Sequence, residues 1–187
     1  MRRSPPHPDP LLPNGEERER ARYILPDLLA PGLSVVFCGS AVGAVSARVG
    51  APYAGPGNKF WPTLHAVGLT PRRFRPDEWR ELRALGIGLT DLNKTQSGSD
   101  ADLTQDGDDA AALERKVMRF QPRIVAFTAK RPASVFLAQR SVAYGMQERR
   151  VGGTALYVLP SPSGRAGAFW DERPWRELAR LVRDGAR

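Results

Sequence analysis

The sequence predicts a three-layer α/β sandwich, with a central, mainly parallel sheet of four to five strands flanked by helices. The first observation is that several short runs are continuously apolar, which is typical of strands buried on both faces. These runs are Leu33–Gly39, Gly86–Leu92, Arg123–Ala129 and Ala155–Leu159. The second observation is that segments with helical spacing alternate with these runs, as in parallel α/β sheets.

Five segments between and after the runs are predicted as helices. They are Lys59–Val67, Pro76–Leu85, Asp108–Phe120, Arg131–Gln139 and Pro174–Val182. Pro76 suits a first helical turn, and apolar residues follow it at helical spacing. Asp108 opens its segment and Arg119 lies near its end, which complements the helix dipole.

We expect a flexible N-terminal tail over residues 1–22, followed by one folded domain over residues 23–187. The tail is Pro-rich and then charged, without a period that could bury a face. No run approaches the roughly 18 apolar residues of a spanning helix, and no apolar signal region follows the first arginines. We therefore expect no membrane partner and a cytoplasmic location, near the nucleoid of a bacterium. The single cysteine, Cys38, excludes an intrachain disulfide and a cysteine-based metal site.

The charge balance favours an anionic partner. Twenty-eight basic residues against 20 acidic ones give a net charge of +8 and a pI near 10.3, which suits nucleic acid. Arginine supplies 24 of the 28 cations, and a GC-rich genome would produce the same skew. Charge alone therefore favours a polyanion without identifying one.

Ligands of parallel sheets bind beyond the carboxyl ends of the strands. The segments at that edge are Cys38–Gly43, Thr90–Asn93, Thr128–Lys130 and Pro160–Arg165. The turn predicted at Gly39–Gly43 could cradle a phosphate, but it has neither the GK[ST] ending of a P-loop nor the G-x-G-x-x-G pattern. It could equally be a tight exit from the strand.

Three motifs at this edge carry a resemblance. They are VVFCGSAVGAVSARVGAPYAGPGNKFW (35–61), GIGLTDLN (86–93) and LPSPSG (159–164). In this order and spacing the chain resembles the mismatch-specific uracil/thymine DNA glycosylases over about residues 27–184. The resemblance implies a parallel sheet between helices and monofunctional hydrolysis of the N-glycosidic bond of uracil, flipped out of double-stranded DNA and often opposite guanine. It also implies an abasic product, no metal or cofactor, and a monomer that acts in base excision repair.

The chain departs from the family pattern where the attacking water is positioned. The family has Asn where this chain has Ala41, and an alanine cannot orient water. Asp91, at the carboxyl edge of the second predicted strand, is the candidate replacement, because a carboxylate can orient water and stabilise a sugar cation. The alternative is an aspartate that closes a turn or caps a helix.

The resemblance assigns a substrate-binding set around the base. This set is Ser40, Ala41, Ser46, Tyr53 and Asn58. Tyr53 would stack on the flipped base, and Ser46 would lie near its C5 edge. Asn58 would hydrogen-bond the base edge. The alternatives are a packed loop tyrosine and a helix N-cap asparagine.

The resemblance also assigns a DNA-binding set. This set is Lys130, Ser161, Ser163, Gly164 and Arg165. Arg165 would fill the gap left by the flipped base, as a wedge in the minor groove. A lysine at a helix N-terminus is favourable where the lysine and the helix N-terminus both face a phosphate, and Lys130 is predicted to occupy such a position. The alternatives are solvated surface cations and serines that cap a turn.

Three functions therefore compete. The first is a DNA glycosylase that removes uracil and related damaged pyrimidines. The second is a relative that binds mismatches or damage but has lost catalysis, as Ala41 suggests. The third is an unrelated phosphate-binding α/β protein that uses the Gly39–Gly43 segment.

Overall fold

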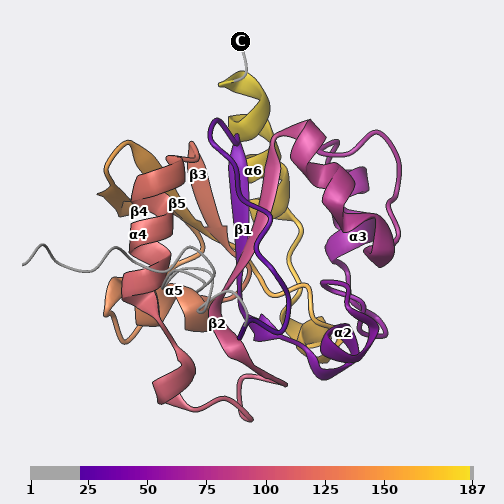
Figure 1. Cartoon of the computed structure of the whole chain (residues 1–187). Coiled ribbons are helices and arrows are strands. Elements are labelled where there is room, and N and C mark those ends of the chain that lie inside the picture. The colour runs from indigo at the N-terminus through magenta and orange to yellow at the C-terminus, as the bar shows by residue number, and fades with distance from the viewer. Residues whose placement is uncertain (1–21, 186–187) are drawn as a thin grey trace, which may run out of the picture.

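The computed structural model describes residues 22–185, which form a five-stranded sheet with helices on both faces (Figure 1). The strands are β1 (Val35–Val42), β2 (Ile87–Ser97), β3 (Ile124–Phe127), β4 (Gly145–Val151) and β5 (Thr154–Val158). Their order is β2-β1-β3-β5-β4, and only β4 runs antiparallel to its neighbour. The predicted flexible tail lies almost entirely outside the described residues.

The helical segments are α2 (Ala44–Val49), α3 (Phe60–Ala66), η1 (Pro76–Leu85), η2 (Gln105–Gly107), α4 (Ala110–Phe120), α5 (Lys130–Leu137), η3 (Gly164–Phe169) and α6 (Arg173–Asp184). Two helices, α4 and α5, pack on one face of the sheet, and α3, η1 and α6 pack on the other. Along β1, Val35 and Phe37 belong to the apolar cluster under α3, η1 and α6. Val36 and Cys38 belong to the cluster under α4 and α5. The predicted three-layer fold class is confirmed.

All four predicted strands are present, and the sequence misses the fifth, β4. Its residues GMQERRV are mostly exposed or half-buried, because β4 is an edge strand that pairs only with β5. Polar residues on an edge strand protect the sheet from further pairing, and the same residues hide the strand from an apolar pattern. The six-residue α2 is likewise missed.

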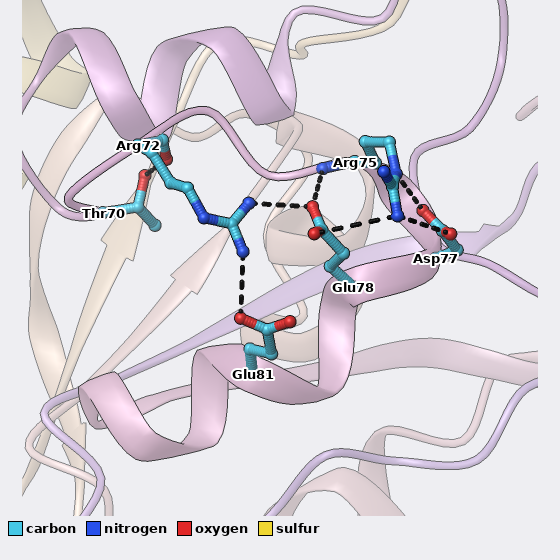
Figure 2. Close-up of polar contacts among 6 residues, drawn as sticks. All are labelled: Thr70, Arg72, Arg75, Asp77, Glu78 and Glu81. Carbon is cyan, nitrogen blue, oxygen red and sulfur yellow. Dashed lines mark hydrogen bonds and ion pairs between the residues drawn. The ribbon is translucent and has the colours of Figure 1, made fainter.

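The segment predicted as a helix over Pro76–Leu85 is a 3₁₀ helix. A network of exposed charges surrounds its start (Figure 2): the Glu78 carboxylate accepts hydrogen bonds from the Arg75 backbone N–H at 2.7 Å and from the Arg72 guanidinium at 2.9 Å. Such exposed pairs contribute little to stability. Burial of Trp79 and Leu82 under the sheet therefore anchors this segment.

Both strands that carry the candidate site are longer than the sequence predicts. β1 continues to Val42, so the Gly39–Gly43 segment is largely strand and not the predicted turn. The structure therefore lacks the turn that the phosphate-cradle hypothesis requires at Gly39–Gly43. β2 continues to Ser97, which places Asp91 inside the strand, opposite Gly39 of β1.

The chain preceding β1 covers the outer edge of β2. The Ile24 backbone N–H donates to the Lys94 carbonyl at 3.0 Å, and Leu28 exchanges two backbone hydrogen bonds with Leu89. The edge at Asp91 is therefore covered, and polar side chains beside it lie in a low-dielectric environment. Over residues 22–185, no helix has the length and apolar character needed to cross a bilayer.

Candidate active site

The site is built around Asp91 and Gly39, which are neighbours across β1 and β2. A Cβ atom added to Gly39 would lie 2.6 Å from Asp91 Oδ1 and 3.6 Å from the Tyr53 hydroxyl. The missing side chain thus leaves the space that the carboxylate occupies. The Asp91 side chain is 17% exposed, so this buried carboxylate retains some contact with solvent.

Tyr53 and Thr128 complete this end of the sheet. The Tyr53 hydroxyl lies 3.3 Å from Thr128 Oγ1, directly after β3. The Tyr53 ring stacks on Phe60, with centroids 3.8 Å apart and planes 13° apart. Burial and the nearby Asp91 charge raise the pKa of Tyr53 well above its ordinary value, so the phenol stays protonated. One ring face is therefore already covered by Phe60, and the hydroxyl is held at Thr128, near the space beside Gly39.

A buried charge cluster lies behind the carboxylate. We use this name for Asp27, Asp91, Lys94 and Lys116. Lys94 Nζ lies 3.5 Å from Asp91 Oδ2 and 2.9 Å from Asp27 Oδ1, while Lys116 Nζ lies 2.8 Å from Asp27 Oδ2. Thr90 donates its hydroxyl to Asp27 at 2.7 Å. The N-terminal segment, β2 and α4 thus meet in one polar contact.

The two carboxylates of the charge cluster have opposite pKa shifts. Burial raises the pKa of Asp91 above its ordinary value, and the attraction of Lys94 offsets this only in part. Burial also acts on Asp27, but the attraction and hydrogen bonds of Lys94 and Lys116 outweigh it and lower its pKa. Asp91 is the less stabilised carboxylate of the two.

The predicted substrate-binding residues fall into two groups. Ser40 and Ala41 continue β1 directly beyond Gly39 and are half-buried. Ser46 and Asn58 make local contacts instead: Ser46 Oγ accepts from the Ala54 backbone N–H at 2.9 Å, and Asn58 Oδ1 accepts from the Phe60 backbone N–H at 2.9 Å. These contacts shape the loop that carries Tyr53, whatever else the two residues do.

A cavity of about 410 Å³ adjoins the site. Its lining residues are Tyr53, Ala54, Gly55, Gly57, Asn58, Trp61, Pro62, Arg73, Phe74, Arg75 and Pro76. Tyr53 is therefore shared between this cavity and the space beside Asp91. Asn58 faces the cavity, and Asp91 is not among its lining residues.

The predicted DNA-binding loop packs tightly on the Tyr53 loop. The Lys59 backbone N–H donates to the Pro162 carbonyl at 2.8 Å. A Cβ atom added to Gly164 would lie 2.8 Å from the Pro56 carbonyl oxygen. Glycine at position 164 thus permits the close approach, and the next residue, Arg165, is exposed.

The other predicted DNA-binding residues lie at or near this edge. Ser163 Oγ accepts from the Arg165 backbone N–H, and Ser161 Oγ accepts from the Ser163 backbone N–H, each at 3.3 Å. Both serines therefore order the loop. Lys130, the exposed first residue of α5, places Nζ 4.6 Å from the centroid of the Tyr144 ring.

Sequence reasoning missed Asp27, Lys94 and Lys116. Lys94 stands three residues after Asp91 in a strand-like run, which is an unusual place for a lysine and was the one available signal. Asp27 and Lys116 come from separate elements, and no pattern links them before folding. Within residues 22–185 no group of three or more histidine, cysteine or acidic side chains gathers as a metal site would require.

Comparisons with known proteins find relatives of this chain in sequence and in fold. The sequence model of the "Uracil DNA glycosylase superfamily" matches residues 26–180. A solution NMR structure of a "putative Uracil DNA glycosylase" from Methanosarcina acetivorans is similar, with a TM-score of 0.58 and 25% sequence identity. The similarity covers 86% of this chain and 95% of that chain. The match reaches the superfamily, and the mismatch-specific family within it stays a prediction.

Proposed function

Because the chain belongs to the uracil DNA glycosylase superfamily, we propose that it hydrolyses the N-glycosidic bond of uracil in double-stranded DNA, with a preference for G·U mismatches. The single observation that carries the proposal is the Asp91 carboxylate, held beside Gly39 within the paired strands β1 and β2. The superfamily membership supports a DNA glycosylase; the uracil and mismatch preferences are the proposal's own.

The chemistry requires a negative charge beside the sugar. The bond to the base breaks with its electron pair leaving on the base, and the sugar becomes cationic. A carboxylate stabilises that cation, and water attacks C1′ while one of its protons passes to the carboxylate. In this proposal Asp91 performs both tasks, which Ala41 cannot.

Binding would follow from the loops around Asp91. The target nucleotide must leave the duplex to reach a site at this depth. We place the flipped base against Tyr53 and against the protein backbone that follows Gly39, with Ser40 beside the base. The loop at Gly164 would present Arg165 to the duplex, and the net charge of +8 suits the phosphate backbone.

A single-turnover assay tests the proposal. Labelled duplexes carrying G·U, A·U or G·T, and a single strand carrying U, are incubated with the protein and then with alkali, which cleaves abasic sites. We expect cleavage at uracil, fastest in G·U. Asp91→Asn is expected to slow it by at least about 100-fold with DNA affinity unchanged. Asp106→Asn, a change at an exposed aspartate of η2, is the matched control.

The competing function is a relative that binds damaged or mismatched DNA without catalysis. The observation in its favour is Ala41, which stands in β1 opposite Asn93 of β2 and carries no polar group. This function predicts binding of the G·U duplex with no abasic product by the wild-type protein. Equal product from wild type and Asp91→Asn would instead remove Asp91 from the reaction.

A further inference from the structure

Lys94 is a buried lysine that the proposed chemistry does not use. Its side chain is 7% exposed, and burying an ammonium group costs free energy unless partners compensate. Tying the N-terminal segment to α4 does not require it, because Lys116 and Thr90 already bind Asp27. What Lys94 adds is its contact with Asp91 Oδ2.

We propose that Lys94 is a positioning residue that keeps Asp91 ionised, with Oδ1 beside Gly39 and Tyr53, and that Asp27 limits how strongly it does so. This proposal rests on the proposed function for its catalytic meaning. Its electrostatic part concerns the folded protein alone and can be measured without substrate.

The distances show how Lys94 divides its charge. Its Nζ is closer to Asp27 than to Asp91, at 2.9 and 3.5 Å. Burial by itself would lower the pKa of Lys94, but the two carboxylates raise it above its ordinary value, so the ammonium form persists. Asp91 therefore shares the Lys94 ammonium group with Asp27. This attraction holds Asp91 in place but offsets the cost of its burial only in part.

Three charged groups and two neutral ones act on Asp91. The titratable and charged side chains that act on it are Lys94 of its own strand, Asp27 of the N-terminal segment, Lys116 of α4, Cys38 of β1 and Tyr53 of the α2–α3 loop, with Tyr23 packed against both lysines. Burial raises the pKa of Cys38 and of Tyr53, which keeps both neutral. The charge on Asp91 is thus set by two opposing effects: the lysines favour its ionised form, and the negative charge of Asp27 disfavours it.

These opposing effects predict that two nearly isosteric changes shift the pH at which Asp91 ionises in opposite directions. Lys94→Gln removes the nearest cation, so Asp91 should ionise at a higher pH, by about one pH unit. Asp27→Asn removes a competing anion and releases Lys94 to Asp91, so Asp91 should ionise at a lower pH. Lys94→Arg retains the cation and should leave the midpoint near that of the wild type.

The direct test follows the Asp91 carboxyl carbon by ¹³C NMR across pH in the full-length protein. Its resonance is assigned by its loss in Asp91→Asn. Arg149→Gln is the control and should not shift the midpoint, because Arg149 lies on β4 at the far edge of the sheet and forms an exposed ion pair with Glu114 of α4. Lys116→Gln, at a side chain 20% exposed, should shift it upward by less than Lys94→Gln and serves if that variant does not fold.

Single-turnover rates measured over the same pH range give the second readout. The acid limb of the rate should move with the NMR midpoint, upward in Lys94→Gln and downward in Asp27→Asn. A purely structural role for Lys94 would lower rates at every pH and shift neither midpoint. Midpoints that stay fixed, or that move in the same direction, overturn the proposal.

The two readouts also separate this proposal from the proposed function. If the midpoints move in opposite directions but no uracil is released at any pH, the charge cluster behaves as proposed and the glycosylase function fails. If uracil is released normally but the midpoints do not move, the glycosylase function stands and the role of Lys94 fails.

Discussion

Asp27 and Asp91 are two carboxylates of one buried charge cluster, yet they are built differently. Asp27 receives Lys94, Lys116 and the Thr90 hydroxyl, all within 2.9 Å. Asp91 has one distant ion-pair contact, at 3.5 Å, and its other oxygen lies beside Gly39. A carboxylate that holds a fold together is saturated with partners, whereas one that must act on a substrate keeps part of its capacity unused.

The largest expected effect tests this difference through stability. Asp27→Asn leaves the buried Lys94 and the half-buried Lys116 without their shared anion, so we expect the free energy of unfolding to fall by about 3 kcal/mol. Asp91→Asn removes a poorly compensated buried charge, so we expect a change below about 1 kcal/mol in either direction. Urea unfolding at pH 7 measures both.

The same two variants should respond differently to acid. The lowered pKa of Asp27 means that its contribution to stability is present above its unfolded pKa and is lost as the pH falls through its folded pKa. The deficit of Asp27→Asn should therefore shrink below about pH 4. The raised pKa of Asp91 has the opposite effect on stability. The free energy of unfolding of the wild type should therefore rise relative to that of Asp91→Asn as the pH falls. Equal losses in the two variants at every pH would show that the carboxylates are equivalent.

A second test disturbs the pocket side without changing charge. In Gly39→Ala the added Cβ would lie 2.6 Å from Asp91 Oδ1, so the carboxylate must move. A displacement near 1 Å costs about 10- to 100-fold in rate, and we expect that loss in single-turnover base release. Gly43→Ala is the matched control, because its Cβ would meet nothing within 4 Å. A Gly39→Ala enzyme of normal rate would mean that Asp91 does not need this position.

The sequence predicted the regular parts of this molecule better than its charge cluster. Continuous apolar runs identify β1, β2, β3 and β5 because burial on both faces leaves a local pattern. β4 escapes because an edge strand is exposed and polar. The motifs also predict Gly39, Asp91 and the Gly164 loop at one edge, since parallel strands end together; the structure pairs Gly39 with Asp91 but places both inside their strands.

The partners of Asp91 could not be found in this way. Asp27 and Lys116 join the charge cluster from elements distant in the chain and reach Asp91 only through Lys94, and only the packing of the N-terminal segment against β2 and α4 brings them together. Ser46 and Asn58 show a second limit: the motif context predicts contacts with the base, and the structure adds local backbone hydrogen bonds that the motif does not specify. The predicted base contacts of both residues stay a prediction.

The smallest expected effect concerns the outer end of the site, where Arg165 is exposed next to Gly164. If Arg165 contacts one phosphate, Arg165→Ala should reduce the slope of log affinity against log salt by about one. If it fills the gap left by the flipped base, the loss should instead be larger for a G·U duplex than for an undamaged one. Fluorescence anisotropy over a salt series separates the two, with Arg80→Ala, an exposed arginine stacked on Trp79 of η1, as the control. An unchanged slope together with unchanged affinity for both duplexes would confine recognition to the pocket around Asp91.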